Sequence, residues 1–247
     1  MRLGILGDDQ ARAPHHRNST TLSTGMSDVC GTCPSAQRVI IALEEAKANY
    51  IKYEVDPWNK PECPALTYGG PPVDPSNPSP ESAKLTESLV LLEFIADLYP
   101  DSGLLSANPV ERAHARFIID VFHTKVFDAF YGIIWGGGSP DIVRWFDGLS
   151  GPAPSASQVW SVLGWRKINI ADAAVAPFLA RKKIYAEIFE NERFGTLQKY
   201  TEALLSRDTV KNSFPEDKYL GQVKTYIESK GKGKAEDVAS VHFALLD

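Results

Sequence analysis

Residues 33–38, Cys33-Pro34-Ser35-Ala36-Gln37-Arg38, set a cysteine directly before a proline that opens a helical run lasting to Ala48. Proline suits the first position of a helix, because its φ is helical and the amide hydrogen it lacks would have no partner there. Cys33 is therefore expected at the N-cap, where unpaired amides and the positive end of the helix dipole stabilise a thiolate. The alternative is a buried cysteine that acts only as a small apolar side chain.

Strands and a second helix are predicted after this first helix. Residues 50–55 alternate apolar and charged side chains, as in a half-buried strand, and residues 64–68 form a short strand that ends at two glycines. Residues 71–82 contain five prolines and are predicted to be a surface loop. The pair Glu87-Ser88 marks the start of an apolar helix over residues 89–99. This order indicates an α/β domain.

From Pro109 onward every long segment is predicted to be helical. Apolar residues at helical spacing define one amphipathic helix that ends before the three glycines at 136–138. Another helix begins at Asn169, because Asn169 and Asp172 have the spacing of a capping box. Residues 150–166 have no assignable pattern. The predicted organisation is a mobile extension over residues 1–27, an α/β domain over 28–102, an all-helical domain over 109–232 and a tail over 233–247. The last helical segments of the all-helical domain are predicted at 194–206 and 216–230.

The composition argues against several functional classes. A net charge of −5 over 247 residues disfavours nucleic acid as a partner. The apolar stretches are too short to cross a membrane, and residues 1–25 lack the apolar core of a secretory signal. Three cysteines do not form a disulfide framework, and no histidine lies at zinc-finger spacing from them. We therefore expect a cytoplasmic protein that holds no metal.

Three features together predict a site for a small anionic peptide thiol. The first is the thiolate of Cys33. The second is the backbone of Cys63 beside Pro64, which, if Pro64 is cis, would pair with an extended ligand as an added strand. The third is the pair at the next helix start, where Ser88 and its amides would bind a carboxylate and Glu87 an ammonium group.

Four motifs, in this order and spacing, resemble the glutathione transferases, and specifically their cysteine-bearing, omega-like class in fungi. The resemblance covers most of residues 33–230 and implies an α+β chain, with a thioredoxin-like domain followed by an all-α domain, joined near Asn108. It also implies a homodimer and a role in detoxification. The motifs are Cys33-Pro34 with Ala36-Gln37-Arg38, Asn59-Lys60-Pro61-Glu62, Glu87-Ser88-Leu89-Val90-Leu91-Leu92-Glu93, and Ile170-Ala171-Asp172.

The resemblance also assigns roles to particular residues, with glutathione as the co-substrate. Cys33 would form a mixed disulfide with glutathione. Lys60 would bind the glycyl carboxylate, and the backbone of Cys63 beside Pro64 would bind the cysteinyl unit. Glu87 and Ser88 would bind the γ-glutamyl end.

The chain departs from the family pattern in three places. Family members have an apolar strand that leads directly into the cysteine, whereas residues 26–32 are mostly glycine, serine and polar residues, which form strands poorly. We therefore expect the first strand to be absent, or rebuilt from residues 2–6. A helix-length segment is missing between Glu62 and Cys63, and residues 150–166 lack the helix usual in the family.

These observations lead to three hypotheses. The first is a thioltransferase in which Cys33 removes glutathione from a disulfide, with Cys30 as a candidate resolving thiol. The second is a non-catalytic carrier of hydrophobic or aromatic small molecules in the cleft between the domains, with a degraded glutathione site. The third is a chain too altered to hold a stable catalytic domain. The cleft of the second hypothesis would be lined by Phe127, Phe130, Tyr131 and Trp135, which at helical spacing are also typical of a core.

Overall fold

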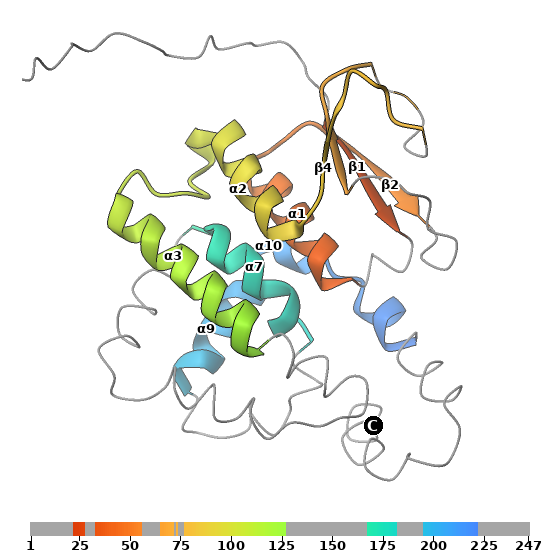
Figure 1. Cartoon of the computed structure of the whole chain (residues 1–247). Coiled ribbons are helices and arrows are strands. Elements are labelled where there is room, and N and C mark those ends of the chain that lie inside the picture. The colour runs from red at the N-terminus through yellow and green to blue at the C-terminus, as the bar shows by residue number, and fades with distance from the viewer. Residues whose placement is uncertain are drawn as a thin grey trace, which may run out of the picture.

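Four strands form one mixed sheet in the order β2-β1-β3-β4 (Figure 1). The computed structural model describes residues 22–27, 33–55, 65–71, 73, 77–126, 167–181 and 195–221. Strand β1 is parallel to β2 and antiparallel to β3, and β3 is antiparallel to β4. The strands are β1 (Leu22–Ser27), β2 (Tyr50–Val55), β3 (Leu66–Tyr68) and β4 (Ala83–Leu85).

The expectation of an absent or rebuilt first strand is wrong. Strand β1 occupies residues 22–27, which fall within the predicted extension, and pairs with β2 from Leu22 opposite Tyr50 to Ser27 opposite Val55. Its other edge pairs with β3. A strand bonded on both edges draws its stability from two ladders of backbone hydrogen bonds, and these outweigh the poor strand propensity of glycine and serine. The rest of the predicted extension, residues 1–21, lies outside the described residues.

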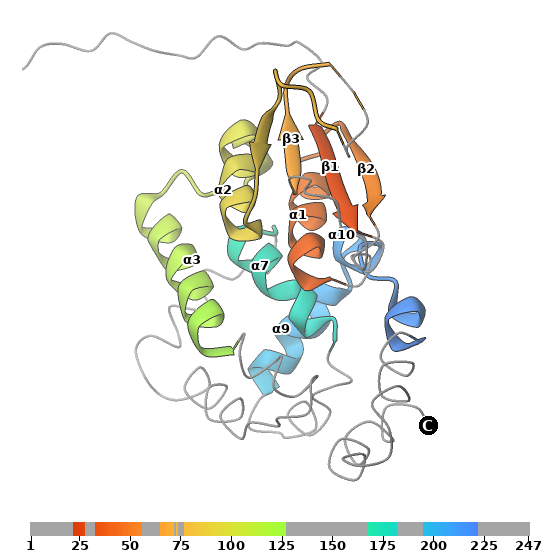
Figure 2. The same ribbon diagram turned by 45° about the vertical axis from the view of Figure 1, so that its right-hand side comes forward.

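Helix α1 (Pro34–Glu45) begins where the sequence predicts. Pro34 is at its first position, and Cys33 is the N-cap, with an extended backbone at φ −76° and ψ 120°. Helix α2 (Ser88–Leu98) starts at the predicted Glu87-Ser88 pair. Figure 2 shows α1 and α2 alongside each other against one face of the sheet. Helix α1 also packs against a helix of the second half of the chain, α7 (Ile170–Leu179).

The second half of the described chain is helical, as predicted. After a short 3-10 turn (η2, Pro100–Ser102) and a linker, α3 begins at Pro109, with Asn108 as its N-cap and the Asn108 side chain accepting from the amide of Val110 at 2.9 Å. Residues 216–221 are helical as well. The described elements are α3 (Pro109–Val121), a π-helical turn η3 (Phe122–Val126), α7 (Ile170–Leu179), α9 (Gly195–Leu205) and the short α10 (Asp208–Lys211). Helix α10 was not predicted from the sequence.

One hydrophobic cluster runs through both halves. It extends from Leu66 of β3 through buried residues of α1 and α2 to Ile170 and its neighbours in α7, and on to Leu197 of α9. The linker takes part, because Leu104 is fully buried and its carbonyl accepts from the amide of Ile170 at 2.9 Å. The two predicted domains therefore share a core at their junction, although the predicted boundaries themselves stay predictions.

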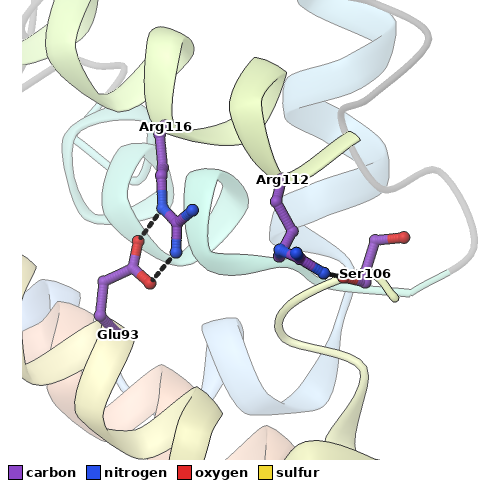
Figure 3. A network of polar contacts seen from close by, with 4 residues as sticks. All are labelled: Glu93, Ser106, Arg112 and Arg116. Atoms are coloured by element: carbon purple, nitrogen blue, oxygen red, sulfur yellow. Dashed lines mark hydrogen bonds and ion pairs between the residues drawn. The ribbon is translucent and has the colours of Figure 1, made fainter. Parts of the chain in front are cut away.

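Polar contacts on the surface also join the two halves (Figure 3). Arg116 of α3 forms two hydrogen bonds of 2.8 Å with the carboxylate of Glu93 in α2. Arg112 donates to the carbonyls of Ser106 and Ala107, both at 3.0 Å, and so holds the linker against the start of α3. Exposed ion pairs of this kind contribute at most about 1 kcal/mol, so the shared core stabilises the junction more than these contacts do.

The predicted capping box at the start of α7 is confirmed. The Asn169 side chain accepts from the amides of Ala171 at 2.8 Å and Asp172 at 3.2 Å, while Asp172 Oδ2 accepts from the amide of Asn169 at 2.8 Å. The structure adds a contact that spacing does not predict, in which the buried hydroxyl of Tyr200 in α9 donates to Asp172 Oδ1 at 2.7 Å. Asp172 is fully buried, so it is a structural carboxylate.

Candidate functional site

Cys33 stands at the amino-terminal end of α1, half-buried, with its backbone carbonyl accepting from the amide of Gln37 at 3.0 Å. The first turn of α1 contains no acidic residue that would oppose a negative charge at this end. The first amides of a helix have no partner within the helix and carry the positive end of its dipole. This position therefore favours the anionic form of the Cys33 thiol.

The second part of the site is the start of α2. Glu87 has φ 68° and ψ 105°, a left-handed backbone that residues with a Cβ seldom adopt. The Glu87 carbonyl accepts the first hydrogen bond of the helix, from the amide of Leu91 at 2.9 Å, and the Glu87 side chain is exposed. Strained residues of this kind persist where the surrounding structure imposes them, and they occur often at ligand sites. Ser88, the first residue of α2, is half-buried beside it.

Arg38 connects the two parts. It lies in α1 and is only 2% exposed. Its Nη1 donates to Ser88 Oγ at 3.2 Å and its Nε donates to the carbonyl of Ala174 in α7 at 2.8 Å. Its guanidinium carbon lies 4.9 Å from the ring centroid of Phe178, also in α7, at cation–π distance. One side chain thus contacts α2 and α7 from α1.

A second buried arginine, Arg181, lies just beyond the end of α7. Its Nη1 donates to Gln37 Oε1 at 3.0 Å and also to the carbonyl of Pro177. Its guanidinium carbon lies 4.6 Å from the ring centroid of Phe214. Gln37 in turn donates to Ser213 Oγ at 3.1 Å. This junction holds α1 to the carboxyl-terminal helices.

In the sequence, Gln37 and Arg38 stand out only as part of a motif, and no local pattern predicts a role for either. The signal that was available is their polarity next to the buried run from Val39 to Leu43. Polar side chains beside such a run are either on the exposed face or paired inside, and burial decides between the two. Only the tertiary structure shows that both are paired inside.

Several predicted site residues lie outside the described residues, so their roles stay predictions. Within the described ranges, no group of three or more histidine, cysteine or acidic residues is arranged to hold a metal ion. The described helices include none that is long and apolar enough to cross a membrane. The predicted site residues outside the described ranges are Cys30, Lys60, Cys63, Pro64, Phe127, Phe130, Tyr131 and Trp135.

Comparison with known proteins places this geometry in a family. No protein-family model matches the chain. The crystal structure of glutathione transferase Omega 1C from Trametes versicolor is 35% identical, with a TM-score of 0.71, over 84% of this chain and 96% of that one. Omega 2C from the same fungus is 33% identical, with a TM-score of 0.68, over 84% and 98%. Glutathione S-transferase DHAR2 of Arabidopsis thaliana is 23% identical over 205 residues, covering 78% of this chain and 88% of the relative.

The chain therefore belongs to the glutathione transferases. Its similarity is to the fungal Omega class, as the motifs predict. The predicted fold, a thioredoxin-like domain followed by a helical domain, is confirmed by the same matches, and the protein is a glutathione transferase enzyme. The predicted homodimer and the predicted cytoplasmic location stay predictions.

Proposed function

We propose that this glutathione transferase works as a thioltransferase with Cys33 as its nucleophile. The observation that carries the proposal is the position of Cys33 as the N-cap of α1, with Pro34 at the first helical position and no acidic residue in the first turn. A thiolate is the nucleophile in disulfide exchange, and a helix amino terminus favours it. A serine or tyrosine at this place would activate bound glutathione but would form no disulfide with it.

The reaction has two steps. The Cys33 thiolate attacks the glutathione sulfur of a disulfide R–S–SG, so that a Cys33–SG bond forms, the S–S bond of the substrate breaks, and R–S⁻ leaves and takes a proton from water. A second glutathione, as its thiolate, then attacks the mixed disulfide at the glutathione sulfur, releases oxidised glutathione and restores the Cys33 thiolate. The R sulfur is reduced from disulfide to thiol and the sulfur of the second glutathione is oxidised from thiol to disulfide, while the first glutathione sulfur stays in a disulfide throughout, so the electrons balance.

We further propose that the γ-glutamyl end of glutathione binds at the start of α2. The Ser88 hydroxyl and the first amides of α2 would bind its carboxylate, because helix amino termini favour anions. Glu87, exposed on a strained backbone, would bind its ammonium group. Lys60, Cys63 and Pro64 complete the proposed site, as the resemblance implies.

We expect glutathione to raise the melting temperature. At 100 times its Kd a ligand adds about 2.7 kcal/mol to stability, and in a chain of this size each kcal/mol raises the melting temperature by roughly 2 to 4 °C, which gives roughly 5 to 11 °C. The measurement is a thermal melt of the reduced protein with glutathione titrated to well above millimolar. Ser88→Ala is the control and should need more glutathione for the same rise. A cooperative melt whose melting temperature does not change with glutathione would rule out the proposed site.

The alternative is a carrier of hydrophobic or aromatic molecules in the cleft between the domains. It is supported by glutathione transferase Omega 2S from Trametes versicolor, whose structure was solved in complex with 2,4-dihydroxybenzophenone. That structure is 30% identical, with a TM-score of 0.66, over 83% of this chain and 96% of that one. Quenching of tryptophan fluorescence by this compound distinguishes the two functions. Quenching that is equally strong with and without glutathione, in a protein that shows no thiol transfer, would favour the carrier.

A further inference from the structure

The Ser88 hydroxyl is an acceptor toward Arg38. A guanidinium group has only donors, so the 3.2 Å contact between Arg38 Nη1 and Ser88 Oγ uses a lone pair of the serine oxygen. The Ser88 hydrogen must therefore point to some other group. Among the described residues, no hydrogen bond is found in which the Ser88 hydroxyl donates. The hydroxyl hydrogen is thus available to donate to an incoming acceptor.

Arg38 is itself held in place by the helical domain. Its Nε donates to the carbonyl of Ala174 at 2.8 Å, and its planar group lies over the Phe178 ring. Helix α7 contains Pro177, which has no amide hydrogen to donate to the carbonyl of Ala173, four residues earlier. The hydrogen-bond ladder of the helix is therefore interrupted one residue before Ala174. Burial at 2% exposure and contacts on two sides leave the guanidinium group little freedom.

We propose that Arg38 is a positioning residue for glutathione, acting through Ser88. It orients the Ser88 hydroxyl as a donor to the α-carboxylate of the γ-glutamyl end, and it places a positive charge behind that hydroxyl. This inference rests on the proposed role of Ser88 in glutathione binding. Because Arg38 is fixed by Ala174 and Phe178, recognition of this carboxylate depends on α7, which lies in the other half of the chain.

The test compares two ligands that differ only at this carboxylate. One is glutathione, and the other is 4-aminobutyryl-cysteinylglycine, which lacks the α-carboxylate and keeps the ammonium group. We expect Arg38→Met to weaken glutathione binding by about 10- to 100-fold, the range for a hydrogen bond to a charged group, and to leave the affinity for the analogue nearly unchanged. In turnover, KM for glutathione should rise by the same factor, while kcat at saturating glutathione should stay within about threefold.

Two further variants separate positioning from a general structural effect. Arg181→Met removes the other buried arginine beside α1, and it should change the affinities for glutathione and the analogue by equal factors. In a Ser88→Ala background, Arg38→Met should weaken glutathione binding by less than about threefold further, because the group through which Arg38 acts is gone. If Arg38→Met does not fold, Arg38→Lys replaces it in the comparison of the two ligands. Its ammonium group cannot hold Ala174 and Ser88 together in the same fork geometry, so a smaller but still carboxylate-dependent loss is expected.

Several results would overturn the proposal. One is an equal loss of affinity for glutathione and for the analogue in Arg38→Met or Arg38→Lys, which would make the role of Arg38 merely structural. Another is an undiminished effect of Arg38→Met in the Ser88→Ala background, which would mean that Arg38 acts independently of Ser88. If the unaltered protein binds neither ligand, the proposed function itself has failed. That outcome is distinguishable, because it is seen before any substitution is made.

Discussion

Cys33→Ser removes thiol transfer, with the rate of glutathione release from a glutathionylated peptide falling by about a thousandfold or more. The serine hydroxyl stays protonated at neutral pH even at a helix amino terminus, and it cannot form the mixed disulfide on which both proposed steps depend. The measurement is the initial rate of glutathione release at saturating peptide. The proposed γ-glutamyl contacts come from α2, so glutathione binding should survive the substitution.

The control for Cys33→Ser is therefore the glutathione-dependent rise in melting temperature. It should remain within a few degrees of that of the unaltered protein, which would show that the variant is folded and still binds the co-substrate. The variant is also expected to gain conjugation of glutathione to an electrophile, since glutathione is no longer captured as a disulfide. A Cys33→Ser protein that keeps its full thioltransferase rate would show that the nucleophile lies elsewhere, with Cys30 and Cys63 the next thiols to test.

The second large effect is on stability. Asp172→Ala should lower the free energy of unfolding by about 3 kcal/mol, because it removes one half of the capping box and leaves the buried hydroxyl of Tyr200 without its acceptor. The measurement is the midpoint and slope of urea unfolding. Tyr200→Phe, which keeps the capping box and removes only the hydroxyl, is the matched control and should cost about 1 to 2 kcal/mol.

The double variant tests whether these two residues act together. Asp172→Ala combined with Tyr200→Phe should cost less than the sum of the two single changes, because the unpaired hydroxyl is absent from the double variant. An Asp172→Ala protein within about 0.5 kcal/mol of the unaltered one would contradict a structural role for this carboxylate.

Tyr200 also gives the fold a dependence on high pH. Burial, and next the negative charge and hydrogen bond of Asp172, hold the pKa of Tyr200 well above its ordinary value of 10.0. A pKa that is higher in the folded than in the unfolded state means that the unfolded chain loses its proton first. The contribution of Tyr200 to the free energy of unfolding is therefore fully present below pH 10.0. It falls as the pH rises further, by up to about 1.4 kcal/mol per pH unit.

The alkaline dependence is measured as the urea midpoint at intervals above pH 9. Burial also raises the pKa of Tyr50 and Tyr99, which contribute with the same sign, so the informative comparison is with Tyr200→Phe. That variant should lose stability less steeply above pH 10. Identical slopes in the two proteins would exclude Tyr200 as the main source of the alkaline effect.

Local patterns predicted much of this fold, and the failures have a physical cause. The starts of α1, α2 and α7 depend on residues within one turn of each other, namely Cys33 with Pro34, Glu87 with Ser88, and Asn169 with Asp172. Short-range signals of this kind can be seen in the chain itself. Strand β1 was missed because its residues have little strand propensity, and its stability comes from β2 and β3, which pair with its two edges.

The candidate site divides in the same way. The sequence was sufficient to place Cys33 at a helix start and Ser88 at another, and to associate both with a peptide thiol, since each depends on its immediate neighbours. The tertiary structure alone decided that Arg38 joins Ser88 to Ala174. These two residues are separated from Arg38 by 50 and 136 positions in the chain. Contacts at such separations depend on how helices pack, and packing is a property of the whole core rather than of any local pattern.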